Sequence, residues 1–318
     1  MIWKIQVATG EVGERIDVFL TTKFPKYSRS QIQQGIDEKK VQVNKKIIKS
    51  SYKLREDDKV EIDTKFFKEL NKPIELKAEN IPIKVLYEDK DLIAVDKPAG
   101  IVVHPAQGNT SGTLVNALLN YNPKIIKARA DDSNYAAIRP GIVHRLDKDT
   151  SGIVIVAKDS KTLSALSKLW QSGKVEKYYT ALALGQINDV GEIRTDIGRN
   201  KTERKKMAVA DSGKPAATKY SKTGEFHFNK SALSQVLVQI ITGRTHQIRV
   251  HMKYIGHPII GDQTYYTKDS KRISDILGAK RQMLHASKIV FKLPANKKRI
   301  EVTSNLPDDF QSVIDKLS

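Results

Sequence analysis

Cysteine is absent from the 318-residue chain. Disulfide cross-links, thiolate metal sites and cysteine nucleophiles are therefore excluded. Long apolar runs are missing as well: a stretch such as 236–241 reaches only the length of a strand, far short of a membrane span. The first ten residues contain no apolar run long enough for a secretory signal. These absences predict a cytoplasmic protein that makes no use of a membrane.

Acidic residues are scarce relative to basic ones. The chain has 55 Lys and Arg against 36 Asp and Glu, a formal net charge of +19. A surface with this excess attracts nucleic acid, anionic lipid or acidic proteins, although solvated lysines from a lysine-rich proteome would give the same balance. Hydrophobic residues still make up 39% of the chain, so we expect a globular protein with a real core.

Composition divides the chain into two domains and a linker. A charged stretch that contains two prolines runs from Lys65 to Pro82, and proline and charge both oppose a packed core. We therefore expect a small N-terminal domain at 1–66, a linker at 67–82 and a larger domain at 83–318.

The N-terminal segment has the pattern of two helices followed by short strands. Apolar residues recur with helical spacing at 15–20, and Ser28 can cap a second helix over 28–40. Strands are expected at 41–43 and 59–62, with Asn44 and Lys45 in the turn after the first of them.

This segment resembles the S4 RNA-binding domain in the pattern SRSxIxxxI, a basic turn, VxVN and a final DDKVEI strand. Between Lys23 and Lys53 there are nine Lys or Arg and only two acids. The resemblance implies that the second helix and the basic loop after it lie on RNA, through Arg29, Gln33, Lys39 and Lys40. Such contacts go mainly to phosphate and supply affinity more than sequence reading. A helical hairpin with solvated lysines is the alternative.

From residue 83 onward, strands and helices follow one another in irregular order, which favours an α+β fold over a regular βαβ array. Strands are expected at 85–87, 92–95, 152–157, 175–184 and 235–241. Amphipathic helices are expected at 113–120, between Ser160 and Gly173, and after Thr245, where Ile248, Met252 and Ile255 share one face.

The densest cluster of chemically useful side chains is GIVHRLDKDTSG, residues 141–152. A strand-like start leads into polar and charged residues and then into a turn, a sequence suited to presenting side chains from a rigid scaffold. Taken alone, Asp147 and Asp149 could form a carboxylate pair, and His144 could be a base or a metal ligand. Asp149 can also close the turn through its own backbone, and we favour that role for it.

Several blocks resemble the motifs of the RluA/RluD family of RNA pseudouridine synthases, in the branch with an N-terminal S4 domain. HRLDKDTSG is similar to the family's catalytic loop, KYYTA at 177–181 to its K-x-Y-x-A motif, and GRTHQIRVH at 243–251 to its third motif. Further matches in family order are DKPAG at 96–100, RKKM at 204–207 and GHPIIGD at 256–262. The resemblance implies a catalytic domain built on a mixed, mainly antiparallel sheet.

The resemblance assigns catalytic roles to Asp147, Tyr179 and Arg249. Arg249 would hold Asp147 charged, because opposite charges about 4 Å apart attract by roughly 4 kcal/mol at an effective dielectric near 20. Tyr179 would offer a flat face to the base and a hydroxyl that accepts or relays the C5 proton, with Tyr178 as its packing neighbour.

The expected substrate pocket includes Ile248 as a wall and Arg145 as a brace for the space that the target uridine leaves when it unstacks. His144 is also placed at the pocket, with packing favoured over metal ligation. The segment from Arg199 to Lys222 has eight Lys or Arg against two acids. Its residues Arg204, Lys205 and Lys206 are expected to contact RNA, with a solvated basic loop as the alternative.

No metal and no cofactor are expected. His246 and His251 are five residues apart, which places them on different faces of a helix. The patterns HExxH, Walker A and GxGxxG are absent from the sequence.

The expected activity is isomerisation of uridine to pseudouridine in structured RNA. Asp147 would act by adding to the sugar or base, or by removing a sugar proton. Large-subunit (23S) ribosomal RNA, free or in a pre-ribosomal particle, is the expected target, with transfer RNA as the alternative. An idle RNA-binding or ribosome-assembly protein on the same fold, and a glycosidase that uses Asp147 and Asp149, are competing hypotheses. We expect a monomer with no obligate protein partner.

Overall fold

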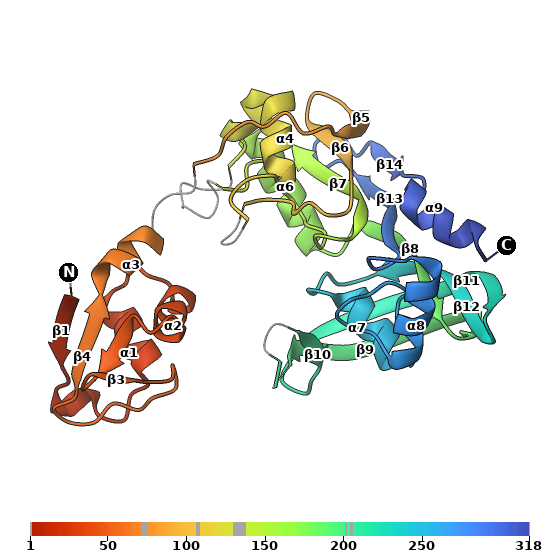
Figure 1. Cartoon of the computed structure of the whole chain (residues 1–318). Coiled ribbons are helices and arrows are strands. Elements are labelled where there is room, and N and C mark those ends of the chain that lie inside the picture. The colour runs from red at the N-terminus through yellow and green to blue at the C-terminus, as the bar shows by residue number, and fades with distance from the viewer. Residues whose placement is uncertain are drawn as a thin grey trace. The chain divides into compact units, whose positions relative to one another are not determined.

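The computed structural model describes residues 2–70, 75–105, 109–129, 138–200, 202–203 and 206–317. Contacts between residues divide the chain into two compact units, Met1–Ile74 and Glu75–Ser318. Figure 1 shows the helices and strands of both units. Each unit has its own buried hydrophobic residues. In the described part of the chain, no helix is long and apolar enough to cross a membrane.

In the N-terminal unit, helices pack on a four-stranded antiparallel sheet with the order β1-β4-β2-β3. Its elements are α1 (Ile16–Lys23), α2 (Arg29–Asp37), α3 (Thr64–Leu70), β1 (Ile2–Gln6), β2 (Val41–Val43), β3 (Lys46–Ile47) and β4 (Lys59–Asp63). Ser28 caps α2 as predicted, and Asn44 and Lys45 turn the chain with positive φ. The sequence does not indicate β1, because none of its side chains is fully buried and it forms by pairing with β4.

The linker predicted at 67–82 needs correction at its N-terminal end, because α3 continues the first unit to residue 70. Phe67 is 1% exposed, and its ring lies 5.2 Å from that of Tyr27. Gly35 of α2 makes room for it, since a Cβ at that position would lie 2.1 Å from the Phe67 ring. Lysines flank Phe67 in the sequence. Their charge predicts an exposed segment, although Phe67 itself is buried.

The C-terminal end of the predicted linker belongs to the second unit. The Glu79 amide donates to the Asn116 carbonyl at 3.0 Å, and the Glu79 carboxylate accepts from the Gly112 amide at 3.0 Å. Asn116 Nδ2 donates to the Lys77 carbonyl at 2.7 Å. Residues 77–79 are therefore attached to the start of α4 (Leu114–Tyr121).

The second unit is built on a ten-stranded sheet in the order β10-β9-β11-β12-β8-β13-β7-β6-β5, with β14 paired to β13 off this path. The strands are β5 (Lys84–Glu88), β6 (Leu92–Lys97), β7 (Ser151–Ala157), β8 (Glu176–Leu184), β9 (Val190–Arg199), β10 (Met207–Val209), β11 (Lys214–Phe228), β12 (Ser231–Ile240), β13 (Leu284–Lys292) and β14 (Arg299–Thr303). β7 and β13 pair in parallel and their neighbours pair antiparallel. The predicted α+β fold with a mixed, mainly antiparallel sheet is confirmed.

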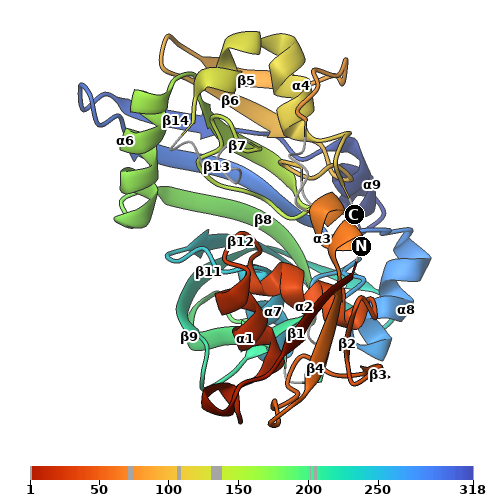
Figure 2. The same cartoon turned by 90° about the vertical axis from the view of Figure 1, so that its left-hand side faces the viewer.

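Helices cover both faces of this sheet: α4, α6 (Ser160–Gln171), α7 (Gln247–Tyr254), α8 (Lys268–Leu277) and α9 (Asp308–Asp315). Along β7, Val154 joins the core that contains α4, whereas Ile153 and Ile155 join the core that contains α6. α4 and α6 lie beside β5–β7, and α7 and α8 beside β9–β12 (Figure 1). Seen from the side, β13 and β14 run next to α6 (Figure 2).

Two helices are capped one residue away from Ser160 and Thr245, the residues that mark their starts in the sequence. Asp159, not Ser160, caps α6 by accepting from the Thr162 amide at 2.8 Å, as expected where a carboxylate is available at the positive end of a helix. His246, not Thr245, precedes α7 and has a left-handed backbone with φ of 57°.

Phe67→Ala should destabilise the N-terminal unit by about 3–5 kcal/mol, because a large buried ring is removed from a small core. Lys68→Ala, an exposed change in the same helix, is the matched control. Hydrogen exchange of α1 and α2 peptides measures the effect. Equal exchange in the two variants would show that α3 is not part of this core.

Candidate active site

The loop 141–152 ends where β7 begins to pair with β13. Gly152 has φ of 113°, and a Cβ there would lie 2.4 Å from the Ala286 carbonyl oxygen, so glycine is required for this close pairing. Arg281 Nη1 donates to the Asp149 carbonyl at 3.2 Å, and Gln282 Nε2 donates to Thr150 Oγ1 at 3.1 Å. The residues just before β13 therefore hold the loop in place.

Lys97, at the end of β6, holds the same loop from another side. Its side chain is fully buried, and Nζ donates to the carbonyls of Pro98 at 2.8 Å and of Ile101 and Lys148 at 3.0 Å. Burial lowers the pKa of Lys97 to about 7, although the charge of Asp149 opposes this change. The sequence does not indicate this role, because Lys97 stands out there only as a member of the DKPAG block.

Arg249 joins Asp147 to a second, buried carboxylate. Its Nη1 donates to Asp147 Oδ2 at 3.1 Å, while Nε and Nη2 donate to Asp262 at 2.7 and 2.8 Å. Burial opposes the charged form of Arg249, but hydrogen bonding to Asp262 and the charges of both carboxylates raise its pKa above the usual value. For Asp262, burial is outweighed by Arg249 and two backbone amides, so its pKa is lowered.

A small cavity of about 90 Å³ lies over the Asp147 carboxylate, and Arg145, Tyr179, Ile248 and Arg249 also line it. The Asp147 side chain is 23% exposed, so a substrate can reach it. Tyr179 is buried on β8, and burial, followed by the charge of Asp147, raises its pKa well above the usual range. Its hydroxyl is therefore a neutral phenol. The predicted residues come from a loop, a strand and a helix that are far apart in the sequence.

His144 lies outside this cavity. Its Nε2 accepts from the Ile155 amide at 3.0 Å, and its ring stacks on Trp170 with centroids 5.2 Å apart. Burial, with a smaller contribution from Lys177, lowers the pKa of His144 to about 3. The ring is therefore neutral and supports the loop by packing. It lines a neighbouring cavity of about 570 Å³, which shares Arg145 and Tyr179 with the cavity over Asp147.

Tyr178 lies apart from the cavity over Asp147, although it was expected to pack beside Tyr179. Neighbouring residues of a strand point to opposite faces, and the Tyr178 hydroxyl donates to Glu176 at 2.8 Å. It lines a separate cavity with Tyr220.

Two residues near Asp147 have no role assigned from the sequence. His246 Nε2 lies 3.9 Å from Asp147 Oδ2, and its Nδ1 lies 2.8 Å from the Tyr265 hydroxyl. Burial lowers the pKa of His246, against the attraction of Asp147. Asp262 is the second residue without a role assigned from the sequence. Both occur in blocks that match the family, and that match was the only signal that marked them.

Among the described residues, no group of three or more His, Cys, Asp or Glu could hold a metal ion. His251 has both ring nitrogens close to hydroxyls, with Nδ1 2.9 Å from Thr218 Oγ1 and Nε2 3.0 Å from Thr195 Oγ1. Its ring is buried and serves packing.

The residues predicted to bind RNA in the N-terminal unit divide into two pairs. Arg29 and Gln33 donate to the buried carboxylate of Asp17, at 3.0 and 2.7 Å. Burial opposes the charge of Asp17, but hydrogen bonds from Arg15, Gln33 and Arg29 hold its pKa well below the usual range. By contrast, Lys39 and Lys40 are exposed after the end of α2.

The basic segment 199–222 consists largely of β10 and the first part of β11. Lys206 pairs with Glu203 at 2.5 Å, and Lys222 pairs with Asp189 and Glu225 at 3.0 and 2.8 Å. Internal ion pairs therefore neutralise part of its charge. Arg204 and Lys205 lie outside the described residues.

Family models match both units of the chain. The family described as RNA pseudouridylate synthase matches residues 91–254, and the S4 domain matches residues 14–60. The chain is 38% identical to a ribosomal large subunit pseudouridine synthase D of Yersinia pestis, over 98% of this chain and 93% of that protein. It is 41% identical to an uncharacterized RNA pseudouridine synthase of Aquifex aeolicus, over 94% and 92%.

Solved structures resemble most of the chain. The human RNA pseudouridylate synthase domain containing 1 superposes with a TM-score of 0.57 at 27% identity, over 72% of this chain and 85% of that one. The human RNA pseudouridylate synthase domain containing 4, at 23% identity and a TM-score of 0.54, shares the fold. From its motifs, its fold and these relatives, the chain belongs to the RNA pseudouridylate synthase family, with an S4 domain before the catalytic domain.

Proposed function

We propose that this enzyme isomerises uridine to pseudouridine at specific positions of large-subunit ribosomal RNA, with Asp147 as the catalytic carboxylate. The observation that carries the proposal is the single carboxylate in the small cavity, oriented by an arginine whose other donors are bound to Asp262. The ribosomal target is supported by the Yersinia pestis relative, whose name states that substrate.

Asp147 has one oxygen available for chemistry. Oδ2 accepts from Arg249 at 3.1 Å, and no described residue donates a hydrogen bond to Oδ1. Oδ1 could add to the sugar or the base, or remove a proton from the sugar. In each route the bond between uracil N1 and ribose C1′ breaks, the base turns, and C5 joins C1′. Arg249 offsets the negative charge that Asp147 brings to the cavity.

The size of the cavity fits a base that has left its stack. Its volume of about 90 Å³ is several times the roughly 10–15 Å³ needed to hold one water, so it can admit a group larger than a water molecule, such as a flat base. Tyr179 and Ile248 would enclose the base while it turns. A neutral tyrosine hydroxyl both accepts and donates, so Tyr179 can relay the C5 proton without forming a phenolate.

We further propose that the enzyme acts as a monomer in the cytoplasm. The proposal is supported by the cavity over Asp147, where the described residues of one chain already bring the carboxylate together with Tyr179 and Arg249.

Asp147→Asn should reduce isomerisation by more than about 10³-fold while RNA affinity stays unchanged, because the shape is kept and the charge is removed. Asp149→Asn is the matched control and should stay within about tenfold of wild type. Tritium release from [5-³H]uridine-labelled RNA measures the rate.

The same variants test the target when cells that lack the gene are complemented with them. Pseudouridines in large-subunit ribosomal RNA should return with wild type and Asp149→Asn, and stay absent with Asp147→Asn. Loss and return only in transfer RNA would contradict the ribosomal target.

Asp262→Asn should lower kcat by about 10²-fold and leave the Kd for RNA unchanged, since the fork of Arg249 loses its charged anchor and Asp147 its fixed partner. Thermal unfolding must accompany the assay, because removing the partner of a buried charge costs about 3–5 kcal/mol. Asp275→Asn, at an exposed ion pair with Lys271, is the control. An unchanged kcat would show that Asp262 does not position the site.

Deleting residues 1–74 should leave a folded enzyme with weaker RNA binding. Its log–log salt slope should be smaller by about two to four units, because each phosphate that the enzyme no longer neutralises reduces the slope by about 0.7–0.9. A deletion of residues 1–66 should aggregate instead, because it would leave the apolar side of α3 uncovered. An unchanged salt slope after the longer deletion would show that the S4 domain does not anchor the RNA.

A further inference from the structure

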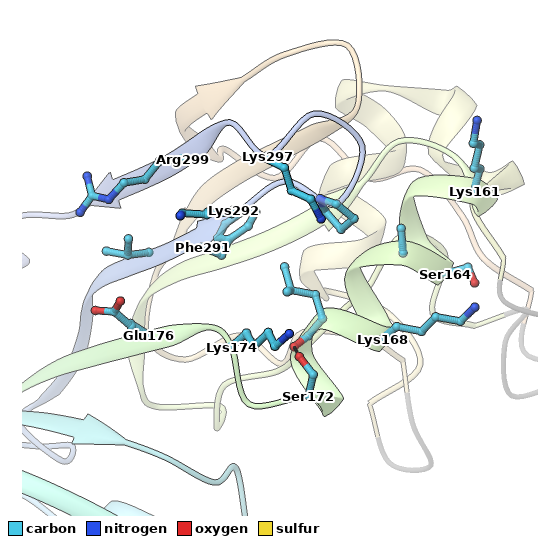
Figure 3. A pocket seen from close by; sticks show the side chains of 14 residues that line it. Lys161, Ser164, Lys168, Ser172, Lys174, Glu176, Phe291, Lys292, Lys297 and Arg299 are labelled. Carbon is cyan, nitrogen blue, oxygen red and sulfur yellow. Dashed lines mark hydrogen bonds between the residues drawn. The ribbon is translucent and has the colours of Figure 1, made fainter.

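A larger cavity opens on the second unit, beside α6. It has a volume of about 870 Å³ and lies between α6, with the turn after it, and the β13–β14 hairpin (Figure 3). Its floor is apolar and includes Leu169, Val290, Phe291 and Pro294. Its rim is basic: Lys161, Lys168, Lys174, Lys292, Lys297 and Arg299. None of the family motifs contains these residues. We call this larger cavity the α6 cavity.

The rim of the α6 cavity is far more basic than the chain as a whole. Its six cationic side chains face one carboxylate, Glu176, whereas the chain has 55 basic and 36 acidic residues. Arg299 pairs with Glu301 at 2.5 Å. Within the described ranges, none of the five lysines forms an ion pair with a carboxylate. Like charges around one cavity repel each other, and a polyanion placed there would remove that repulsion.

The α6 cavity is connected to the active site through the C-terminal end of α6. The Trp170 ring stacks on His144 of the catalytic loop at 5.2 Å and packs against Phe291 of the α6 cavity at 5.4 Å. His144 lines the neighbouring cavity of about 570 Å³, which shares Arg145 and Tyr179 with the cavity over Asp147. Three cavities therefore follow one another around the end of α6.

We propose that the α6 cavity is a secondary site for the phosphodiester backbone of the substrate RNA. A strand that delivers its uridine to Asp147 continues on both sides of that nucleotide, and one side would pass around α6 onto the lysine rim. This inference rests on the proposed function, because it takes RNA to be the substrate.

The chemistry of the rim indicates binding that does not depend on base sequence. Lysine ammonium groups are flexible point charges, which suit phosphates without reading bases. Phe291 is 2% exposed, so the floor offers no free ring face for a base to stack on. The site should therefore add affinity for long RNA and leave the choice of uridine to the region around Asp147.

A triple variant, Lys168→Gln with Lys174→Gln and Lys297→Gln, tests the site. With a [5-³H]uridine-labelled transcript of large-subunit ribosomal RNA, KM should rise about tenfold or more, and the log–log salt slope should fall by about two to three units. kcat at saturating RNA should stay within about twofold, because the lysines do not line the cavity over Asp147. The matched control removes the same charge from exposed lysines elsewhere on the second unit that form no ion pair with a described residue: Lys230→Gln, Lys268→Gln and Lys280→Gln.

The outcomes separate this inference from the proposed function. If the wild-type enzyme releases no tritium from the transcript, the proposed function fails. If wild type is active but the two triple variants have the same KM and salt slope, the α6 cavity is not an RNA site and the proposed function stands. Competition with polyglutamate tests whether the α6 cavity binds an acidic protein instead of RNA. Loss of polyglutamate binding in the triple variant with unchanged RNA binding would assign the cavity to an acidic protein and overturn the proposal.

Discussion

The active site depends on one guanidinium shared by two carboxylates. Arg249 is almost fully buried, and a buried cation is tolerated only when its donors are paired. Asp262 takes Nε and Nη2, which leaves Nη1 directed at Asp147. A lysine at this position could not do the same, because an ammonium group has no planar fork. Asp262, which does not line the cavity, therefore sets the orientation of the Asp147 carboxylate through Arg249.

Basic side chains near Asp147 also bind the backbone of its loop. Lys97 and Arg281 direct donors at carbonyls of the loop, at Lys148 and Asp149. Carbonyl oxygens held by buried donors cannot turn away without leaving those donors unpaired, so the loop has little freedom to move. Pre-organisation of this kind lowers the cost of bringing a carboxylate and a sugar together. The loop is therefore fixed by basic side chains that do not line the cavity over Asp147.

Local patterns were sufficient wherever structure is decided within a few residues. Ser28 and the Asn44–Lys45 turn are examples, because a cap and a turn depend on their own side chains and backbone. Phe67 was missed because its burial depends on Gly35, 32 residues earlier. Asp147 and Arg249 are 102 residues apart, and only the family resemblance brought them together before the structure did. Asp262 had no such assignment, since nothing in its neighbours shows that it meets an arginine.

Net charge by itself is a weak predictor of an RNA-binding surface, because charges that are paired internally attract little. Arg29 and Gln33 were chosen from a motif, yet both donate to Asp17, and Lys206 and Lys222 pair with carboxylates. Lysines around the α6 cavity belong to no motif, and among the described residues they form no ion pair. A phosphate chain gains most from cations whose charge is not already offset and whose donors are free. We therefore expect the position of RNA to follow the unpaired cations more closely than the total of +19.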